Sequence, residues 1–296
     1  MFDNALSVLR RPSVEPLTLD RADLEKLVET ITLEVARRLG PSAWLSEEFD
    51  AYPTGRSGHV ECVCANDQPA EVRALAGLMD HTLLRPQATR EQVEQLAEEA
   101  RKACFATVCV NPAWVPLVAE QLRGSGVKIA TVVGFPLGAT LTPAKRAEAE
   151  AAILAGAHEI DMVLNVGALK SGDLARVESD IRGVVEVCRA GGALLKVILE
   201  NAYLTDEEKV TACHIAKGAG ADFVKTSTGF APTGAKEEDV RLMRETVGPA
   251  MGVKAAGGIR NLDDALRMLQ AGATRLGTSA SVSILDEAVR SLQLVK

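Results

Sequence analysis

Ala221-Asp222-Phe223-Val224-Lys225-Thr226-Ser227-Thr228-Gly229 is a short apolar run that ends in a lysine and a turn of small polar residues. The apolar part predicts a buried strand, where a lysine is costly because burial disfavours its ammonium form. Two more apolar runs carry a lysine in the same way, at Lys196 and Lys254. The intervals from Lys196 to Lys225 and from Lys225 to Lys254 are both 29 residues. One lysine per strand–helix unit predicts neighbouring parallel strands whose three amines meet in one site.

A buried lysine can serve as a nucleophile. Desolvation lowers its pKa and frees the amine to attack a carbonyl group, and a second cation beside it lowers the pKa further. The alternative for a single lysine is a packed stem whose ammonium group reaches solvent. Three lysines in phase, one of them followed by a Ser/Thr/Gly turn, favour chemistry with Lys225 as the central group.

The chain after residue 70 alternates between strands and helices. The predicted strands are Ala76–Met79, Ala106–Val110, Lys128–Val133, Glu159–Leu164, Leu194–Leu199, Asp222–Val224, Gly252–Ala255 and Thr274–Leu276. The predicted helices are Arg90–Lys102, Ala113–Gln121, Pro143–Leu154, Leu174–Cys188, Thr205–Lys217, Glu237–Thr246, Leu262–Leu269 and Val282–Leu292. Eight such units between residues 71 and 296 predict the α/β class and a closed (β/α)8 TIM barrel.

Residues 1–70 form a separate N-terminal extension in this interpretation. An amphipathic helix is predicted over about residues 19–39, and Ser42 to Glu71 read as a polar linker. The helix either caps the barrel bottom or packs in a homodimer interface, or it is a docking peptide like those of bacterial microcompartment cargo. In each case its apolar face is expected against protein, because its polar face has no dominant basic cluster.

The composition excludes several classes of protein. A formal net charge of −7 and 3% aromatic residues argue against a nucleic-acid or membrane-surface binder. The six cysteines show no zinc-type paired spacing. Met1 to Pro12 lacks the apolar core of a signal peptide, and no stretch reaches the length of a membrane span. We therefore expect a cytoplasmic protein.

The active site of a TIM barrel lies at the carboxyl ends of its strands. Polar residues expected there are Asp80, Thr82, Cys109, Asn111, Asp161, Asn165, Lys196, Glu200, Lys225, Thr226, Ser227, Lys254, Arg260 and Ser279. Asp161 stands inside an apolar run, so its carboxylate would be buried unless it is paired. Proton transfer is one role for it, and a structural ion pair with Lys225 or Lys254 is the other.

Glycine-rich segments follow the last two predicted strands. Gly257-Gly258-Ile259-Arg260 follows the seventh strand and Gly277-Thr278-Ser279 follows the eighth. These loops form the usual phosphate site of such barrels, where glycine lets the backbone approach the anion closely. Together they predict a phosphorylated substrate.

The segment from about residue 76 to residue 290 resembles the deoxyribose-phosphate aldolase family, whose members are class I Schiff-base aldolases. The matching segments are Met79–Leu84, Val132–Gly138, Glu159–Val163, Leu195–Glu200, Val224–Gly229 and Val253–Arg260. The resemblance implies Lys225 as the Schiff-base nucleophile and Lys254 as the cation that lowers its pKa. It implies Asp161, with water and Lys196, as the proton-transfer group. It assigns phosphate binding to Gly229, Gly257, Gly258, Gly277 and Ser279.

The activity so implied is reversible cleavage of 2-deoxyribose 5-phosphate to glyceraldehyde 3-phosphate and acetaldehyde, a step of deoxyribonucleotide catabolism, without metal or organic cofactor. The chain departs from the pattern at Phe230, where some members have lysine, at Asn201-Ala202 and at Ala280. Rival interpretations are a Schiff-base aldolase for another sugar phosphate or keto acid, and a barrel that acts only as a scaffold. A scaffold would have no reason to keep Asp161, Lys225 and Lys254 together.

Overall fold

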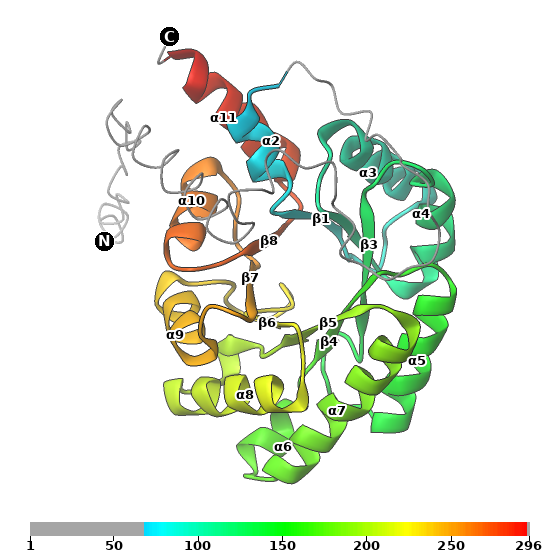
Figure 1. Cartoon of the computed structure of the whole chain (residues 1–296), viewed down its shortest axis with the longest axis vertical. Helices are drawn as coiled ribbons and strands as arrows, with labels where there is room; N and C mark the ends of the chain where they lie inside the picture. Colours follow the sequence, from blue (N-terminus) through cyan, green and yellow to red (C-terminus); the bar gives the residue numbers. More distant parts are fainter. Residues whose placement is uncertain (1–67, 295–296) are drawn as a thin grey trace, which may run out of the picture. The chain divides into compact units, whose positions relative to one another are not determined.

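The computed structural model describes residues 68–294, so the helix expected over residues 19–39 and most of the expected linker lie outside the described part. The end of that linker was predicted wrongly, because Ala70 and Glu71 begin a helix. Eight parallel strands pair in chain order and close into a barrel (Figure 1). The strands are β1 (Met79–Leu83), β2 (Thr107–Val110), β3 (Lys128–Val133), β4 (Glu159–Val163), β5 (Leu194–Ile198), β6 (Phe223–Lys225), β7 (Gly252–Ala256) and β8 (Arg275–Thr278). The predicted (β/α)8 TIM barrel is confirmed.

Helices surround the barrel and connect its strands (Figure 1). They are α2 (Ala70–Ala76), α3 (Arg90–Ala103), α4 (Val115–Gln121), α5 (Thr142–Leu154), α6 (Val166–Lys170), α7 (Leu174–Gly191), α8 (Asp206–Ala219), α9 (Glu237–Val247), α10 (Leu262–Gln270) and α11 (Ser281–Leu294). Two 3-10 turns, Pro112–Trp114 and Asn201–Tyr203, complete the order. Within residues 68–294, no helix has the length and apolar character that crossing a bilayer requires.

Local sequence explains where several helices begin and end. Thr89 and Thr205 open α3 and α8 with capping boxes, in which the threonine hydroxyl and a side chain three residues later each bond the other's backbone N–H. Gly192 and Gly220 close α7 and α8 in the left-handed conformation that glycine adopts without steric cost. These stops return the chain to the start of the next strand.

The first predicted strand, Ala76–Met79, is wrong. Ala76 ends helix α2, which packs against α11, and β1 runs from Met79 to Leu83. The apolar pattern failed here because β1 contains the buried polar residues Asp80 and His81. Asp80 points into the barrel and His81 points outward, where its Nε2 lies 2.8 Å from Oε2 of Glu99 on α3.

Alternation along the strands separates an apolar outer layer from a charged interior. Ile160, Leu195 and Val224 are at most 1% exposed and belong to the layer between strands and helices. Their neighbours on the opposite face are Asp161, Lys196 and Lys225. TIM barrels are usually filled by bulky apolar side chains, so a buried charged cluster inside the barrel calls for a chemical explanation.

Candidate active site

Asp161 on β4 is the centre of the buried charges. Its Oδ1 accepts a hydrogen bond of 2.8 Å from Nζ of Lys196 on β5. Its Oδ2 accepts from Nζ of Lys225 on β6 and from Nζ of Lys254 on β7, both at 2.8 Å. The strand register explains this convergence, because Asp161 pairs with Lys196 and Lys225 pairs with Lys254. The structure thus brings together the three phased lysines and the one carboxylate.

A second set of charges lies beside this centre. Asp80 on β1 forms an ion pair with Lys254, and Glu159 on β4 forms one with Lys196. Arg275 on β8 joins the two carboxylates, since its Nη1 lies 2.8 Å from Oδ1 of Asp80 and 3.4 Å from Oε2 of Glu159. The interior of the barrel therefore holds a connected network of seven ionisable groups, which we call the charged column.

The charged column contains three carboxyl groups (Asp80, Glu159, Asp161) and four cationic groups (Lys196, Lys225, Lys254, Arg275). A buried network is most stable when its charges cancel, because each uncompensated charge carries a desolvation penalty of several kcal/mol. One of the four cationic groups should therefore be neutral.

The shifts in lysine pKa identify Lys225 as the group that is neutral. Burial lowers the pKa of Lys225, and Lys254 lowers it further, against the opposing effect of Asp161. Burial also disfavours the charged form of Lys254, but Asp161 and Asp80 outweigh burial and raise the pKa of Lys254. Both lysines are essentially inaccessible to solvent, so the difference comes from their partners. Lys225 is the amine that can act as a nucleophile, and Lys254 is the permanent cation beside it.

Asp161 and Lys196 keep their charges. Burial favours the neutral acid of Asp161, yet Lys196, Lys225 and Lys254 hold its pKa well below the usual range. Burial likewise disfavours charge on Lys196, but Asp161 and Glu159 raise its pKa. An ionised Asp161 beneath the Lys225 amine can orient that amine and relay protons, with Lys196 on its other oxygen.

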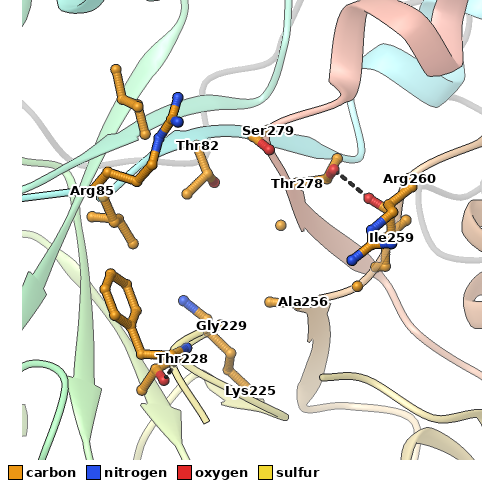
Figure 2. A pocket seen from close by; sticks show the side chains of 16 residues that line it. Thr82, Arg85, Lys225, Thr228, Gly229, Ala256, Ile259, Arg260, Thr278 and Ser279 are labelled. Atoms are coloured by element: carbon orange, nitrogen blue, oxygen red, sulfur yellow. Dashed lines mark hydrogen bonds between the residues drawn. The ribbon is translucent and has the colours of Figure 1, made fainter. Parts of the chain in front are cut away.

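A cavity of about 340 Å³ opens at the carboxyl ends of the strands, and the Lys225 amine points into it (Figure 2). Its lining residues are Thr82, Leu83, Leu84, Arg85, Lys225, Thr228, Gly229, Phe230, Ala256, Gly257, Gly258, Ile259, Arg260, Gly277, Thr278 and Ser279. Of the three clustered lysines, only Lys225 is on this wall. Lys196, Lys254 and Asp161 lie beneath it, inside the barrel.

Hydroxyl groups tie the loops around the cavity together. The Thr228 hydroxyl donates to Glu200, which follows β5, and the amide of Phe230 donates to the Thr228 hydroxyl at 3.0 Å. The Thr278 hydroxyl donates to the carbonyl of Ile259 at 2.7 Å and so connects the end of β8 to the loop after β7 (Figure 2). The mouth of the cavity is therefore held by the fold before any substrate arrives.

Phe135 packs against Phe230, which lines the cavity. Its ring packs edge-on against the ring of Phe230 with centroids 5.3 Å apart. Phe135 belongs to the segment Gly134–Gly138, which follows β3. The aromatic contact joins this segment to Phe230 on the cavity wall.

Two of the expected glycine roles can be separated. Gly229, Gly257 and Gly258 have positive φ angles of 87°, 84° and 81°, which L side chains rarely adopt. Gly277 instead provides space inside the barrel, because a Cβ there would lie 2.9 Å from Cε of Lys254. The first group shapes the cavity wall, and Gly277 also makes room for the Lys254 stem.

Asp80 and Cys109 were expected to line the substrate site, and the structure does not place either on the cavity wall. Asp80 is occupied by Lys254 and Arg275. Cys109 packs with Leu84, Ala130, Val132 and Phe135, and burial raises the pKa of its thiol. The other expected wall residues, Thr82, Gly229, Gly257, Gly258, Arg260, Gly277 and Ser279, do line the cavity.

Sequence reasoning missed Arg85, Glu159 and Arg275. Glu159 stands two residues before Asp161 on one strand, a spacing that places both side chains on the same face, so this signal was present. Arg85 was missed because the first strand was placed too early along the chain. In the described part of the chain, no group of three or more His, Cys, Asp or Glu side chains is arranged to hold a metal ion.

Comparison with known proteins agrees with this geometry. The model of the DeoC/LacD family of aldolases matches residues 74–284. A deoxyribose-phosphate aldolase of Streptococcus pneumoniae (serotype 19F, strain G54) is 62% identical over 207 residues, which cover 70% of this chain and 93% of that protein. One from Aciduliprofundum boonei is 58% identical over 216 residues, covering 73% and 97%. The solved structure of the tetrameric deoxyribose phosphate aldolase from Aeropyrum pernix superposes with a TM-score of 0.70 at 36% identity, covering 75% of this chain and 93% of that one.

Proposed function

Because this chain belongs to the DeoC/LacD family of aldolases, we propose that it cleaves 2-deoxyribose 5-phosphate reversibly to glyceraldehyde 3-phosphate and acetaldehyde. The proposal assigns the Schiff base to Lys225. Relatives with this activity in their names support the substrate, and they are aligned over more than nine tenths of their own length.

One observation carries the assignment of the nucleophile. Lys225 lines the cavity, whereas Lys196 and Lys254 lie beneath it. The same lysine has its pKa lowered by burial and by Lys254. Access to substrate and a neutral amine therefore coincide in one residue, as nucleophilic catalysis by lysine requires.

The chemistry proceeds from that amine. Lys225 Nζ adds to the C1 aldehyde, and the resulting carbinolamine loses water to give an iminium ion. The C3 hydroxyl then loses its proton, the C2–C3 bond breaks, and its electron pair moves into the iminium to form an enamine. Glyceraldehyde 3-phosphate departs. Protonation of the enamine at C2 and hydrolysis of the new iminium release acetaldehyde and restore the Lys225 amine.

Asp161 and its partners supply the proton movements in this proposal. The Asp161 carboxylate contacts Lys225 directly, so it can accept a proton during carbinolamine formation and return it when water leaves. Its low pKa makes it a relay rather than a lasting acceptor. Lys196 stabilises the charged carboxylate, and proton transfer to the more distant C3 hydroxyl passes through water. Lys254 stays charged and keeps Lys225 neutral.

The phosphate is proposed to bind at the loops after β6, β7 and β8. Gly229 and Gly258 have open space beside their Cα atoms, so an anion can approach their backbone N–H groups. Ser279 adds a hydroxyl group on the wall. Phe230 offers no charge, and the cations available are Arg260 and Arg85, which stand on opposite sides of the cavity (Figure 2). A guanidinium group can donate two parallel hydrogen bonds to a phosphate, so either arginine can contribute to binding.

A coupled assay tests the function. The purified protein is incubated with 2-deoxyribose 5-phosphate, and formation of glyceraldehyde 3-phosphate and of acetaldehyde is measured separately. Equal amounts of the two products are expected. Absence of cleavage, combined with cleavage of another sugar phosphate or a keto acid, would assign the barrel to a different substrate.

Residues 1–70 form an N-terminal extension in this proposal, and the aldolase barrel occupies residues 71–296, with Ala70 already at the start of α2. The family match begins only at residue 74. We propose that the extension packs on the barrel or in a homodimer interface. Docking to a microcompartment shell is the alternative, which would place this otherwise cytoplasmic enzyme where a volatile aldehyde is contained. Removal of residues 1–67 distinguishes packing of the extension from docking. A lower melting temperature or a changed oligomeric state of the truncated protein supports packing. An unchanged melting temperature and activity, together with loss of co-localisation with a shell, supports docking.

A further inference from the structure

The charged column extends away from the cavity as far as Arg275. The Arg275 side chain is 15% exposed and contacts Oδ1 of Asp80, whereas Lys254 contacts Oδ2 of the same carboxylate. Its guanidinium group also stands over the Phe223 ring, 5.6 Å from the centroid. Arg275 is not among the cavity-lining residues, so it touches neither substrate nor nucleophile. The Schiff-base mechanism above does not use it.

Arg275 nevertheless completes the charge count of the column. With Lys225 neutral, the three carboxylates face three cations: Lys196, Lys254 and Arg275. If Arg275 were absent, the same three carboxylates could be neutralised only by a proton on Lys225. Asp161 does not take up that proton easily, because burial is outweighed by Lys196, Lys225 and Lys254, which hold its pKa well below the usual range without any contribution from Arg275. Asp80 still has Lys254 and Lys196 beside it, which lower its pKa as well, against the effect of burial. The nucleophile is then the group that must change.

We propose that Arg275 is a positioning residue that keeps the Lys225 amine uncharged, acting through Asp80 and Lys254. Arg275 holds Asp80 by its Oδ1, and Asp80 in turn pairs with Lys254. Without the guanidinium group, the ion pair between Asp80 and Lys254 would become stronger, and the ion pair between Lys254 and Asp161 would become weaker. Asp161 would then attract a proton to Lys225 more strongly. The inference rests on the proposed Schiff-base function.

The groups that face these two residues are few. Lys225 is faced by Asp161 from β4, Lys254 from β7 and Cys109 from β2. Glu200, which follows β5, is also close enough to sense Lys225.

Arg275 is faced by Asp80 from β1 and by Glu159 and Asp161 from β4. Lys254 pairs with it in the strand register. Cys109 has its pKa raised by burial and stays a neutral thiol. Among these groups, Asp80, Asp161 and Lys254 connect Arg275 to the nucleophile.

The test measures reductive trapping of acetaldehyde by cyanoborohydride at Lys225 as a function of pH, with mass spectrometry to locate the adduct. Arg275→Gln is expected to move the pH midpoint of trapping to higher pH by about one unit, which is about a tenfold slower reaction at neutral pH. Arg275→Lys, which keeps the charge, is expected to restore the wild-type midpoint. Arg123→Gln, at an exposed arginine outside the column, is the matched control.

A compensating pair separates electrostatics from packing. Glu159→Gln removes a carboxylate and is expected to move the midpoint in the acid direction. The double variant Arg275→Gln/Glu159→Gln again has equal numbers of opposite charges with Lys225 neutral, so its midpoint should return toward that of the wild type. Melting temperatures confirm that each variant is folded.

An unchanged midpoint in Arg275→Gln would overturn the inference, as would a double variant shifted further than either single one. Wild-type trapping at a lysine other than Lys225 would instead refute the proposed function.

Discussion

Lys225 and Lys254 occupy paired positions on adjacent strands and donate to the same carboxylate oxygen of Asp161, yet only Lys225 reaches the cavity. Two amines of the same type thus have different tasks. Lys225, which lines the cavity, meets the substrate as a neutral amine. Lys254, which lies beneath it, remains charged because Asp80 also pairs with it.

Replacing Lys254 tests this division. Lys254→Leu removes the cation that lowers the pKa of Lys225. We expect the pKa of Lys225 to rise and the activity optimum to move to higher pH, with at least a tenfold loss at neutral pH. The pH dependence of kcat/KM measures the shift. Since Asp80 and Asp161 lose a partner, the variant should also be less stable by about 3–5 kcal/mol. An unchanged pH profile in the folded variant would remove Lys254 from the mechanism.

Lys225 should cost the protein stability at neutral pH. A lysine whose pKa is lower in the folded state than in the unfolded state binds fewer protons when folded, so stability rises with pH between the two pKa values. Below that window the penalty is complete. Lys225→Met is therefore expected to raise the melting temperature at neutral pH while abolishing activity. The difference from the wild type should shrink toward pH 10, and a difference that grows with pH would contradict the lowered pKa.

The phosphate site makes a separate prediction. Arg85→Gln and Arg260→Gln should each raise KM for 2-deoxyribose 5-phosphate by about tenfold or more, with little change for unphosphorylated 2-deoxyribose. Ser279→Asp should raise KM more steeply, because its charge repels the phosphate. Arg123→Gln, at an exposed arginine outside the cavity, is the control. Equal kcat/KM values of the wild type for both sugars would disprove the phosphate assignment.

Gly277 and Gly258 should fail in different ways when replaced by alanine. Gly277→Ala places a methyl group 2.9 Å from Cε of Lys254, so the Lys254 stem or the β8 backbone must shift, which we expect to disturb the contacts of Lys254 with its carboxylates. We expect a lower kcat and a pH optimum displaced toward that of Lys254→Leu. Gly258→Ala strains a loop with φ 81° but meets no atom within 4 Å, so it should act mainly on KM. Identical kinetic effects would argue against separate roles.

The fold was largely predictable because parallel strands buried on both faces leave continuous apolar runs, as in Lys128–Val133, predicted with the bounds that the structure has. The error at Ala76–Met79 has the opposite cause. β1 carries its polar residues within the strand, and the preceding apolar residues belong to α2.

The site was predictable where its residues share one spacing. Lys196, Lys225 and Lys254 repeat at a constant interval, and their convergence on Asp161 follows from the register of neighbouring strands. Arg275 and Arg85 could not be placed this way. Arg275 contacts Asp80, which is 195 residues away in the sequence, and that contact exists only because β8 closes the barrel on β1. Closure is a property of the whole sheet, so no local sequence pattern predicts the contact between Arg275 and Asp80.

The central claim is that Lys225 forms the Schiff base. The most direct measurement is trapping with acetaldehyde and borohydride, in which the modified lysine is located by mass spectrometry in the wild type and in Lys225→Arg. The account predicts one adduct, on Lys225, in the wild type, and none in Lys225→Arg, with the variant folded and inactive. An adduct on Lys196 or Lys254, or trapping that persists in Lys225→Arg, would contradict it.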